Sequence, residues 1–248
     1  AGGQGTRLGY DGPKGCFPIG PVSSKSLFQM HAEKIRAASL RYDTTIPWAI
    51  MTSEANDART REFFREHAYF NLGEENIYFF TQRMLPALDE NGKMILDRKD
   101  HVFTSPDGHG GAFAALKRSG VGAELRKRGI DLLSYFQVDN VLIRIVDPVF
   151  IGYHETRDSQ MSSKMVSKKS PEEKVGVFGL KKGRLQVIEY SDLSEEEMFR
   201  RLDSGKLAYD AGSIAIHVID LDFAEEQAEG GRLPFHVAHK KIPFVNEQ

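Results

Sequence analysis

Residues 46–82 read IPWAIMTSEANDARTREFFREHAYFNLGEENIYFFTQ, and this stretch decides the fold class. It begins with an apolar run at 46–53, continues through a helical pattern at 58–70 and ends with a second apolar run at 76–82. Two buried strands joined by a helix form a parallel pair with a right-handed crossover. The stretch therefore predicts an α/β fold built around a parallel sheet.

The segments on either side extend this pattern. Upstream, Leu27, His31, Ile35 and Ala38 recur at helical spacing and predict an amphipathic helix. Further strand-like segments separated by turns predict a mixed sheet along one wall of a cleft. They are 131–140, 161–169, 174–180, 184–191 and 213–221.

Composition narrows the functional class. The chain has 248 residues, and its 33 Lys and Arg nearly balance its 35 Asp and Glu, so no overall field attracts nucleic acid or an anionic membrane. The single cysteine, Cys16, cannot form an intramolecular disulfide, and no apolar run approaches the roughly 20 residues of a membrane helix. We expect a reducing, cytoplasmic setting and no nucleic-acid or membrane partner.

The opening segment, AGGQGTRLGYDGPKG at 1–15, is rich in glycine. Glycine lets backbone N–H groups turn toward an anion without an obstructing Cβ atom. The dinucleotide fingerprint fails because Leu8 occupies its third glycine position, and the Walker pattern fails because Lys14 follows a proline. What remains is a glycine loop with Arg7 and Lys14, which suits a polyphosphate; an ordinary glycine-rich turn is the alternative.

Two later segments carry further polar groups. SPDGHGG at 105–111 follows one predicted strand, and Asp139 in YFQVDN follows another. Ligands of open α/β sheets bind beyond the carboxyl ends of the strands, where a carboxylate can hold Mg²⁺. His109, between two glycines, either faces a ligand or lies exposed in a turn, and Asp139 alone is nearly as compatible with a capping role.

Eight segments in this order resemble the UTP-dependent sugar-1-phosphate uridylyltransferase family, within it most closely the UDP-N-acetylglucosamine pyrophosphorylases. They are AGGQGTRLG, PKG, QRMLPAL, SPDGHGG, YFQVDN, VIEYSDLS, DAGSIAIH and HVAHKKIPFV. The resemblance implies a Rossmann-like nucleotidyltransferase (GT-A-like) fold, with a mixed, mainly parallel sheet flanked by helices. Within the domain expected over residues 1–248, it implies a nucleotide-binding half at 1–150 and a sugar-binding half at 151–248.

The resemblance also assigns roles to individual positions. It implies catalytic roles for Arg7 and Lys14 and a Mg²⁺-binding role for Asp139. The nucleotide-binding positions are Gly2, Gly3, Gly5, Thr6, Gln82 and Gly108. The sugar-binding positions are His109, Gly176, Glu189 and Ser213.

The implied reaction joins UTP and N-acetylglucosamine 1-phosphate into UDP-N-acetylglucosamine and pyrophosphate. His109 and Ser213 replace asparagines of the N-acetylhexosamine enzymes, and GHG is similar to the glucose-1-phosphate enzymes, so a UTP–glucose-1-phosphate uridylyltransferase is an alternative. The strand that precedes the loop in the family and its C-terminal region are both expected to be missing here. An inactive nucleotide-sugar binding fragment is therefore another alternative, a nicotinamide-dependent oxidoreductase is disfavoured by Leu8, and the oligomeric state stays open.

Overall fold

The computed structural model describes residues 1–108, 110–229, 241–242 and 244–245. The chain divides into two compact units, the first formed by residues 1–131, 138–146 and 221–248, and the second by 132–137 and 147–220. Within the described residues, none of the helices has the length and apolar character that crossing a membrane requires.

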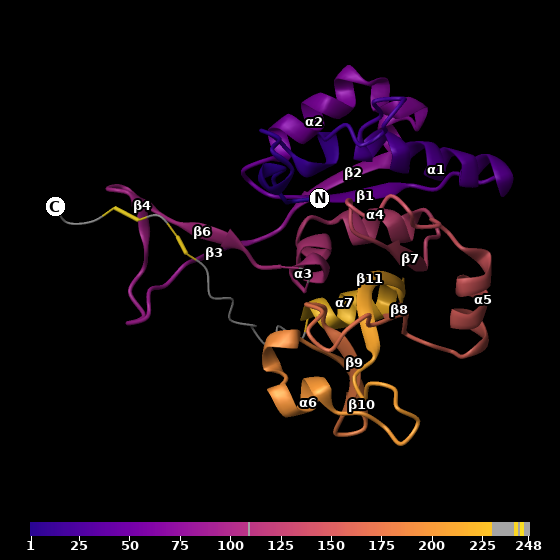
Figure 1. Ribbon diagram of the computed structural model, residues 1–248. Helices are drawn as coiled ribbons and strands as arrows, with labels where there is room; N and C mark the ends of the chain where they lie inside the picture. Colours follow the sequence, from indigo (N-terminus) through magenta and orange to yellow (C-terminus); the bar gives the residue numbers. More distant parts are fainter. Residues whose placement is uncertain (109, 230–240, 243, 246–248) are drawn as a thin grey trace. The chain divides into compact units, whose positions relative to one another are not determined.

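The first unit is centred on the strand–helix–strand segment. Strand β1 (Trp48–Thr52) pairs in parallel with β2 (Ile77–Thr81), with Trp48 opposite Ile77. Helix α2 connects the two strands, and α2 and α3 lie on opposite sides of the pair in Figure 1. The helices are α1 (Leu27–Arg41), α2 (Asp57–Glu66), α3 (Gly111–Arg118), α4 (Val121–Lys127) and α7 (Leu221–Glu229). The crossover predicted for residues 46–82 is confirmed.

An aromatic cluster forms the core between α1, α2 and β1. The ring centroids of Phe28 and Phe64 lie 5.0 Å apart, and Trp48 lies 5.9 Å from Phe28 and 5.6 Å from Phe64. Both phenylalanines are fully buried, and each buried aromatic side chain stabilises the fold by roughly 1.5–3 kcal/mol. This cluster fixes the start of α1 against the sheet.

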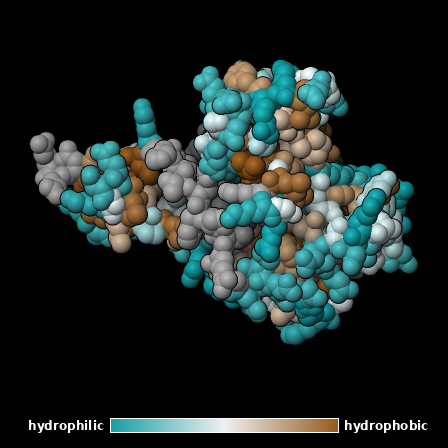
Figure 2. Space-filling view, turned by 90° about the horizontal axis from the view of Figure 1, so that it is seen from below, coloured by the Kyte–Doolittle hydropathy of each residue, from teal (hydrophilic) through white to brown (hydrophobic). Residues whose placement is uncertain are grey.

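Two antiparallel strand pairs form an arm on the first unit (Figure 1). Strand β3 (Met84–Pro86) pairs with β6 (Thr104–Pro106), and β4 (Leu96–Arg98) pairs with β5 (His101–Val102). Between β3 and β4 the chain reverses at Gly92, whose φ of +80° suits the hairpin turn expected from Asn91-Gly92. Apolar side chains are exposed on the arm, as the brown atoms on the left of Figure 2 show.

The second unit is an antiparallel sheet with two helices. Its strand order is β10-β9-β11-β7, and β8 also pairs with β11. The strands are β7 (Leu132–Tyr135), β8 (Met161–Ser167), β9 (Val177–Lys181), β10 (Arg184–Ile188) and β11 (Ala211–Asp220). The helices are α5 (Pro148–Thr156) and α6 (Glu195–Phe199). Asp147 caps α5, as Asp147-Pro148 indicated, because its side chain accepts the N–H of Val149.

The expectation of a mainly parallel sheet is not confirmed. Among the described strands only β1 and β2 pair in parallel, and every recorded pair in the second unit is antiparallel. A two-residue connection, Lys182-Gly183, joins β9 to β10, and both residues have positive φ. Such a turn can only join antiparallel strands, because parallel strands need a long crossover.

Candidate active site

The opening glycine loop is fastened to the segment that follows β1. Ser53 Oγ donates to the carbonyl of Gly2 (3.0 Å), and Asn56 Nδ2 donates to the carbonyl of Gly3 (3.3 Å). Asn56 is itself fixed, because its Oδ1 accepts the N–H of Ser53 at 2.9 Å. The loop carbonyls therefore face this junction of β1 and α2.

The amides of the loop face the other way. In a trans peptide the C=O and N–H point in opposite directions, so the peptides after Gly2 and Gly3 turn their N–H groups away from Ser53 and Asn56. Among the described residues, the N–H groups of Gly3 and Gln4 meet no acceptor. Successive outward N–H groups of this kind bind anions such as phosphate.

Lys14 lies beside these amides because the loop closes on itself. The N–H of Lys14 donates to Gly3 O at 3.0 Å, and the N–H of Gly5 donates to Gly12 O at 2.8 Å. A Cβ atom on Gly3 would lie 3.7 Å from Lys14 Cε, so the lysine side chain passes directly by this glycine. The predicted lysine and the predicted amides therefore share one site.

The remaining loop positions form a short turn. Thr6 and Arg7 belong to the 3₁₀ turn Thr6–Leu8, and the side chain of Arg7 is not among those that the structure describes. Gly5 O accepts the N–H groups of Leu8 and Tyr10 at 2.7 and 3.2 Å. A Cβ atom on Gly5 would come within 3.0 Å of Tyr10, which explains glycine there.

Gln82 and Gly108 come together at the base of the arm. The N–H of Asp107 donates to Arg83 O at 3.0 Å, which joins the residue after Gln82 to the residue before Gly108. Gln82 is buried, and a Cβ atom on Gly2 would overlap its side-chain amide. The first unit thus places Gln82, a predicted nucleotide-binding residue, against the glycine loop.

Asp139 also lies at the loop, within the first unit. Its Oδ2 accepts a hydrogen bond from Lys14 Nζ at 3.0 Å, although the two residues are 125 positions apart. The segment that bears Asp139 is held by α1, since His31 Nε2 donates to Val138 O at 2.8 Å and Lys34 Nζ donates to Ile143 O at 3.1 Å. Burial lowers the pKa of both His31 and Lys34.

The donor set around Asp139 suits Mg²⁺ held partly by substrate. No group of three or more His, Cys, Asp and Glu able to hold a metal occurs among the described residues. Mg²⁺ commonly binds one or two protein carboxylates and completes its shell with water and substrate phosphates. A single carboxylate beside a loop with outward amides fits that pattern.

Three sugar-side positions meet in the second unit. The N–H of Ser213 donates to Gly176 O at 2.7 Å, and a Cβ atom on Gly176 would lie 3.4 Å from Glu189 Oε2. Ser213 also lies at a register shift of β11, an irregularity that is common beside active sites. Gly176, Glu189 and Ser213 are therefore neighbours, whereas His109 lies outside the described residues.

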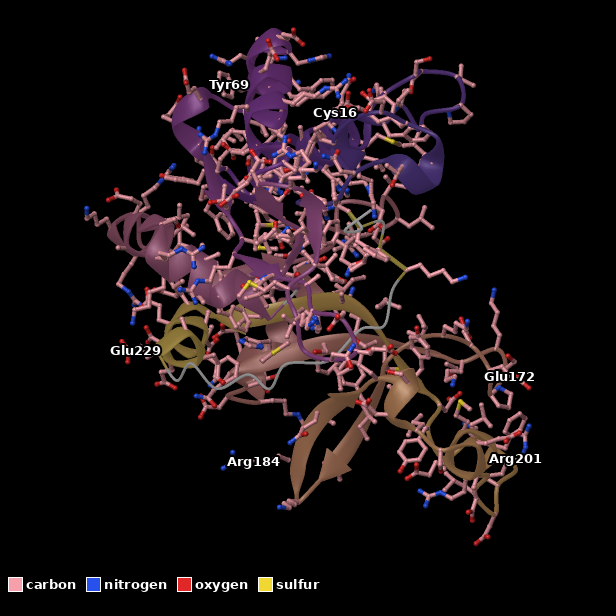
Figure 3. All side chains as sticks on the ribbon, turned by 90° about the vertical axis from the view of Figure 1, so that its left-hand side faces the viewer. Cys16, Tyr69, Glu172, Arg184, Arg201 and Glu229 are labelled. Carbon is pink, nitrogen blue, oxygen red and sulfur yellow. The ribbon has the colours of Figure 1, made fainter. Side chains whose placement is uncertain are left out.

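Cys16 follows the loop, but its thiol is unreactive. Its side chain is buried in the first unit (Figure 3), and burial raises the pKa of its thiol to about 12. The nucleophilic form of cysteine is the thiolate, so this residue offers no nucleophile near neutral pH.

Sequence reasoning did not single out the residues that hold the site together. Ser53 and Asn56 anchor the loop, and His31 and Lys34 hold the Asp139 segment. The Ser-x-x-Asn spacing between a strand and a helix was an available signal for the first pair. For the second pair no local signal exists, because the bonds join residues more than 100 positions apart.

Outward-facing amides, a lysine and a carboxylate on an α/β framework are typical of sites that bind phosphate groups. A model of the UTP–glucose-1-phosphate uridylyltransferase family matches residues 1–247, and the chain belongs to this family.

Relatives and solved structures agree with that placement. The human UDP-N-acetylhexosamine pyrophosphorylase-like protein 1 is 43% identical over 256 residues, which cover 100% of this chain and 50% of the relative. The UDP-N-acetylglucosamine pyrophosphorylase of Saccharomyces cerevisiae is 43% identical over 250 residues, 98% of this chain and 52% of the relative. The crystal structure of the Trypanosoma brucei uridine diphosphate N-acetylglucosamine pyrophosphorylase gives a TM-score of 0.88 at 36% identity, covering 99% and 51% of the two chains. The chain thus spans about half the length of these relatives.

Proposed function

We propose that this chain is the central catalytic part of a uridylyltransferase that forms UDP-N-acetylglucosamine and pyrophosphate from UTP and N-acetylglucosamine 1-phosphate. One observation carries the proposal: Lys14 Nζ lies 3.0 Å from Asp139 Oδ2, beside the amides of Gly3 and Gln4, which meet no acceptor in the described part of the chain. The family and the names of its relatives support the substrate class.

The first unit would bind the nucleotide. The amides of the glycine loop and the side chains of Arg7 and Lys14 would hold the triphosphate and offset the charge that develops on the departing pyrophosphate. Gln82 would contact the uracil, and Gly108 would lie behind the nucleotide. Asp139 would hold Mg²⁺, which supplies additional positive charge to the phosphates when bound.

The reaction needs no general base from the protein. A phosphate oxygen of the sugar phosphate attacks the α-phosphorus of UTP, a new P–O bond forms and pyrophosphate leaves with the electrons of the broken bond. A phosphate monoester has a second pKa of about 6, so this oxygen is already anionic near neutral pH. Catalysis then rests on positioning and on charge neutralisation.

The second unit would bind the sugar. Gly176, Glu189 and Ser213 are already neighbours, and His109 belongs to the same proposed set. In this proposal residues 1–150 form the nucleotide-binding half and residues 151–248 the sugar-binding half. A cytoplasmic location and Mg²⁺ as the physiological metal remain part of the proposal.

A pyrophosphate-release assay with UTP tests this function. The substrates to compare are the 1-phosphates of N-acetylglucosamine, N-acetylgalactosamine and glucose, tested with the chain and with any longer polypeptide that contains it. We expect N-acetylglucosamine 1-phosphate to give the highest kcat/KM. Preference for glucose 1-phosphate would favour the alternative suggested by GHG, and UTP binding without turnover would indicate a binding fragment.

A further inference from the structure

Helix α1 supports the backbone that carries Lys14. Its first turn packs on the 3₁₀ turn Lys14–Cys16, where a Cβ atom on Gly15 would overlap the ring of Phe28. The N–H of Leu27 also donates to Phe17 O at 3.1 Å. Because Phe28 is packed in the aromatic core, the first turn of α1 fixes the position of the 3₁₀ turn that carries Lys14.

Farther along, the same helix holds the segment that carries Asp139. His31 Nε2 donates to Val138 O at 2.8 Å, and Lys34 Nζ donates to the carbonyls of Ile143, at 3.1 Å, and of Val141. His31 and Lys34 are three positions apart, so they lie on one face of the helix. Their contacts bracket Asp139 and the residues immediately after it.

This segment has little regular structure of its own. Residues 138–146 contain no described helix or strand, and they belong to the first unit while the residues on both sides belong to the second. Its internal backbone bonds are long, from Val141 N to Asp139 O at 3.2 Å and from Ile143 N to Asn140 O at 3.4 Å. The buried side chains of Ile143 and Ile145 anchor its far end. Near Asp139, the bonds from α1 supply the support.

We propose that His31 and Lys34 are positioning residues that set the Asp139 carboxylate against Lys14, with α1 as the common support of both charged groups. The inference rests on the function proposed above, and it assigns these residues no contact with substrate. An α-helix rises about 1.5 Å per residue, so the six positions from Phe28 to Lys34 span about 9 Å of rigid support. A displacement of about 1 Å at a reacting group can cost 10²-fold in rate, which makes such rigidity consequential.

The test compares Lys34→Met, which keeps the apolar stem and removes the donors, with Lys34→Arg, which keeps a cationic donor. Hydrogen exchange of the amides in 138–146 reports whether the segment is released. Binding of Mn²⁺ in the presence of UTP, followed by electron paramagnetic resonance, reports the state of Asp139 independently of turnover. The concentration of Mg²⁺ that gives half-maximal pyrophosphate release reports the consequence for catalysis.

We expect Lys34→Met to speed hydrogen exchange in 138–146 and to weaken Mn²⁺ binding by about 3- to 10-fold, as for a displaced metal ligand. The Mg²⁺ concentration for half-maximal activity should rise by the same factor, whereas KM for UTP should stay within about 2-fold of the wild type. Lys34→Arg should restore most of each value. Arg36→Met, which removes an exposed cation from the same helix, is the matched control and should change none of them. If Lys34→Met does not fold, Lys34→Gln takes its place with the same expectation.

Faster exchange with unchanged Mn²⁺ affinity and Mg²⁺ requirement would show that the lysine only stabilises the segment, and would overturn the proposal. Unchanged exchange would overturn it as well. If the wild type releases no pyrophosphate, the proposed function fails, and the exchange and Mn²⁺ measurements still decide whether α1 positions Asp139.

Discussion

The two units assemble their candidate residues by different physical means. In the first unit, side chains reach across the chain to backbone carbonyls, as Ser53 does to Gly2 and His31 does to Val138. In the second unit, backbone pairing brings the candidate residues together, since a backbone hydrogen bond joins Ser213 to Gly176. The first arrangement leaves the amides of Gly3 and Gln4 facing outward beside two charged side chains, whereas the second holds backbone groups next to the Glu189 carboxylate. The comparison predicts that charge changes in the first unit affect turnover and that shape changes in the second affect sugar recognition.

Removal of the Lys14 charge should have the largest effect. Lys14→Met leaves the Asp139 carboxylate without its 3.0 Å partner and removes a cation from the proposed pyrophosphate site. We expect kcat for pyrophosphate release to fall by about 10²- to 10³-fold, as when a preorganised electrostatic contact is lost, with KM for the sugar phosphate little changed. Steady-state kinetics measure both, and Lys93→Met, an exposed lysine of the arm, is the control. Near-normal turnover would remove the basis for assigning catalysis to the first unit.

A methyl group at Gly176 should have an intermediate effect on the other unit. Its Cβ atom would lie 2.8 Å from Val187 Cγ1 and 3.4 Å from Glu189 Oε2, so Gly176→Ala must displace the Val187 side chain and crowds the Glu189 carboxylate. We expect KM for the sugar phosphate to rise by about 3- to 10-fold, the cost of roughly 1 kcal/mol of lost contact, while UTP affinity stays constant.

Gly152→Ala provides a matched control in the same unit. A Cβ atom there meets nothing within 4 Å, and alanine favours the helical conformation of α5. Sugar KM should therefore stay at the wild-type value. A fall in UTP affinity with Gly176→Ala would show that the two units do not divide the substrates as proposed.

The parts of the fold that follow from a local sequence pattern were predictable. The apolar runs at 46–53 and 76–82 became β1 and β2, and the opening glycine segment became a loop in which the amides of Gly3 and Gln4 face outward. The dominance of parallel pairing was not confirmed, because β7 and β8 both pair antiparallel with β11 and the two-residue turn at Lys182-Gly183 joins antiparallel strands. The roles of His31 and Lys34 were not predictable, since a hydrogen bond between distant segments leaves no periodic trace in the sequence.

The smallest effect concerns acid stability of the first unit. His31 was expected on the apolar face of a helix and is fully buried there, and burial lowers its pKa below the ordinary value of about 6.5. Below that ordinary value the unfolded chain takes up a proton that the folded chain resists, so the free energy of unfolding should fall as the pH drops below about 6.5, by at most about 1.4 kcal/mol per pH unit for one group. Above about pH 6.5 this residue should contribute no pH dependence, because the imidazole is neutral in both states.

Urea unfolding between pH 5 and 8 measures the slope, and His31→Phe should reduce it while lowering stability at every pH through the lost bond to Val138. An unchanged slope in that variant would assign the acid sensitivity to other groups and would leave His31 with only its role as a hydrogen-bond donor.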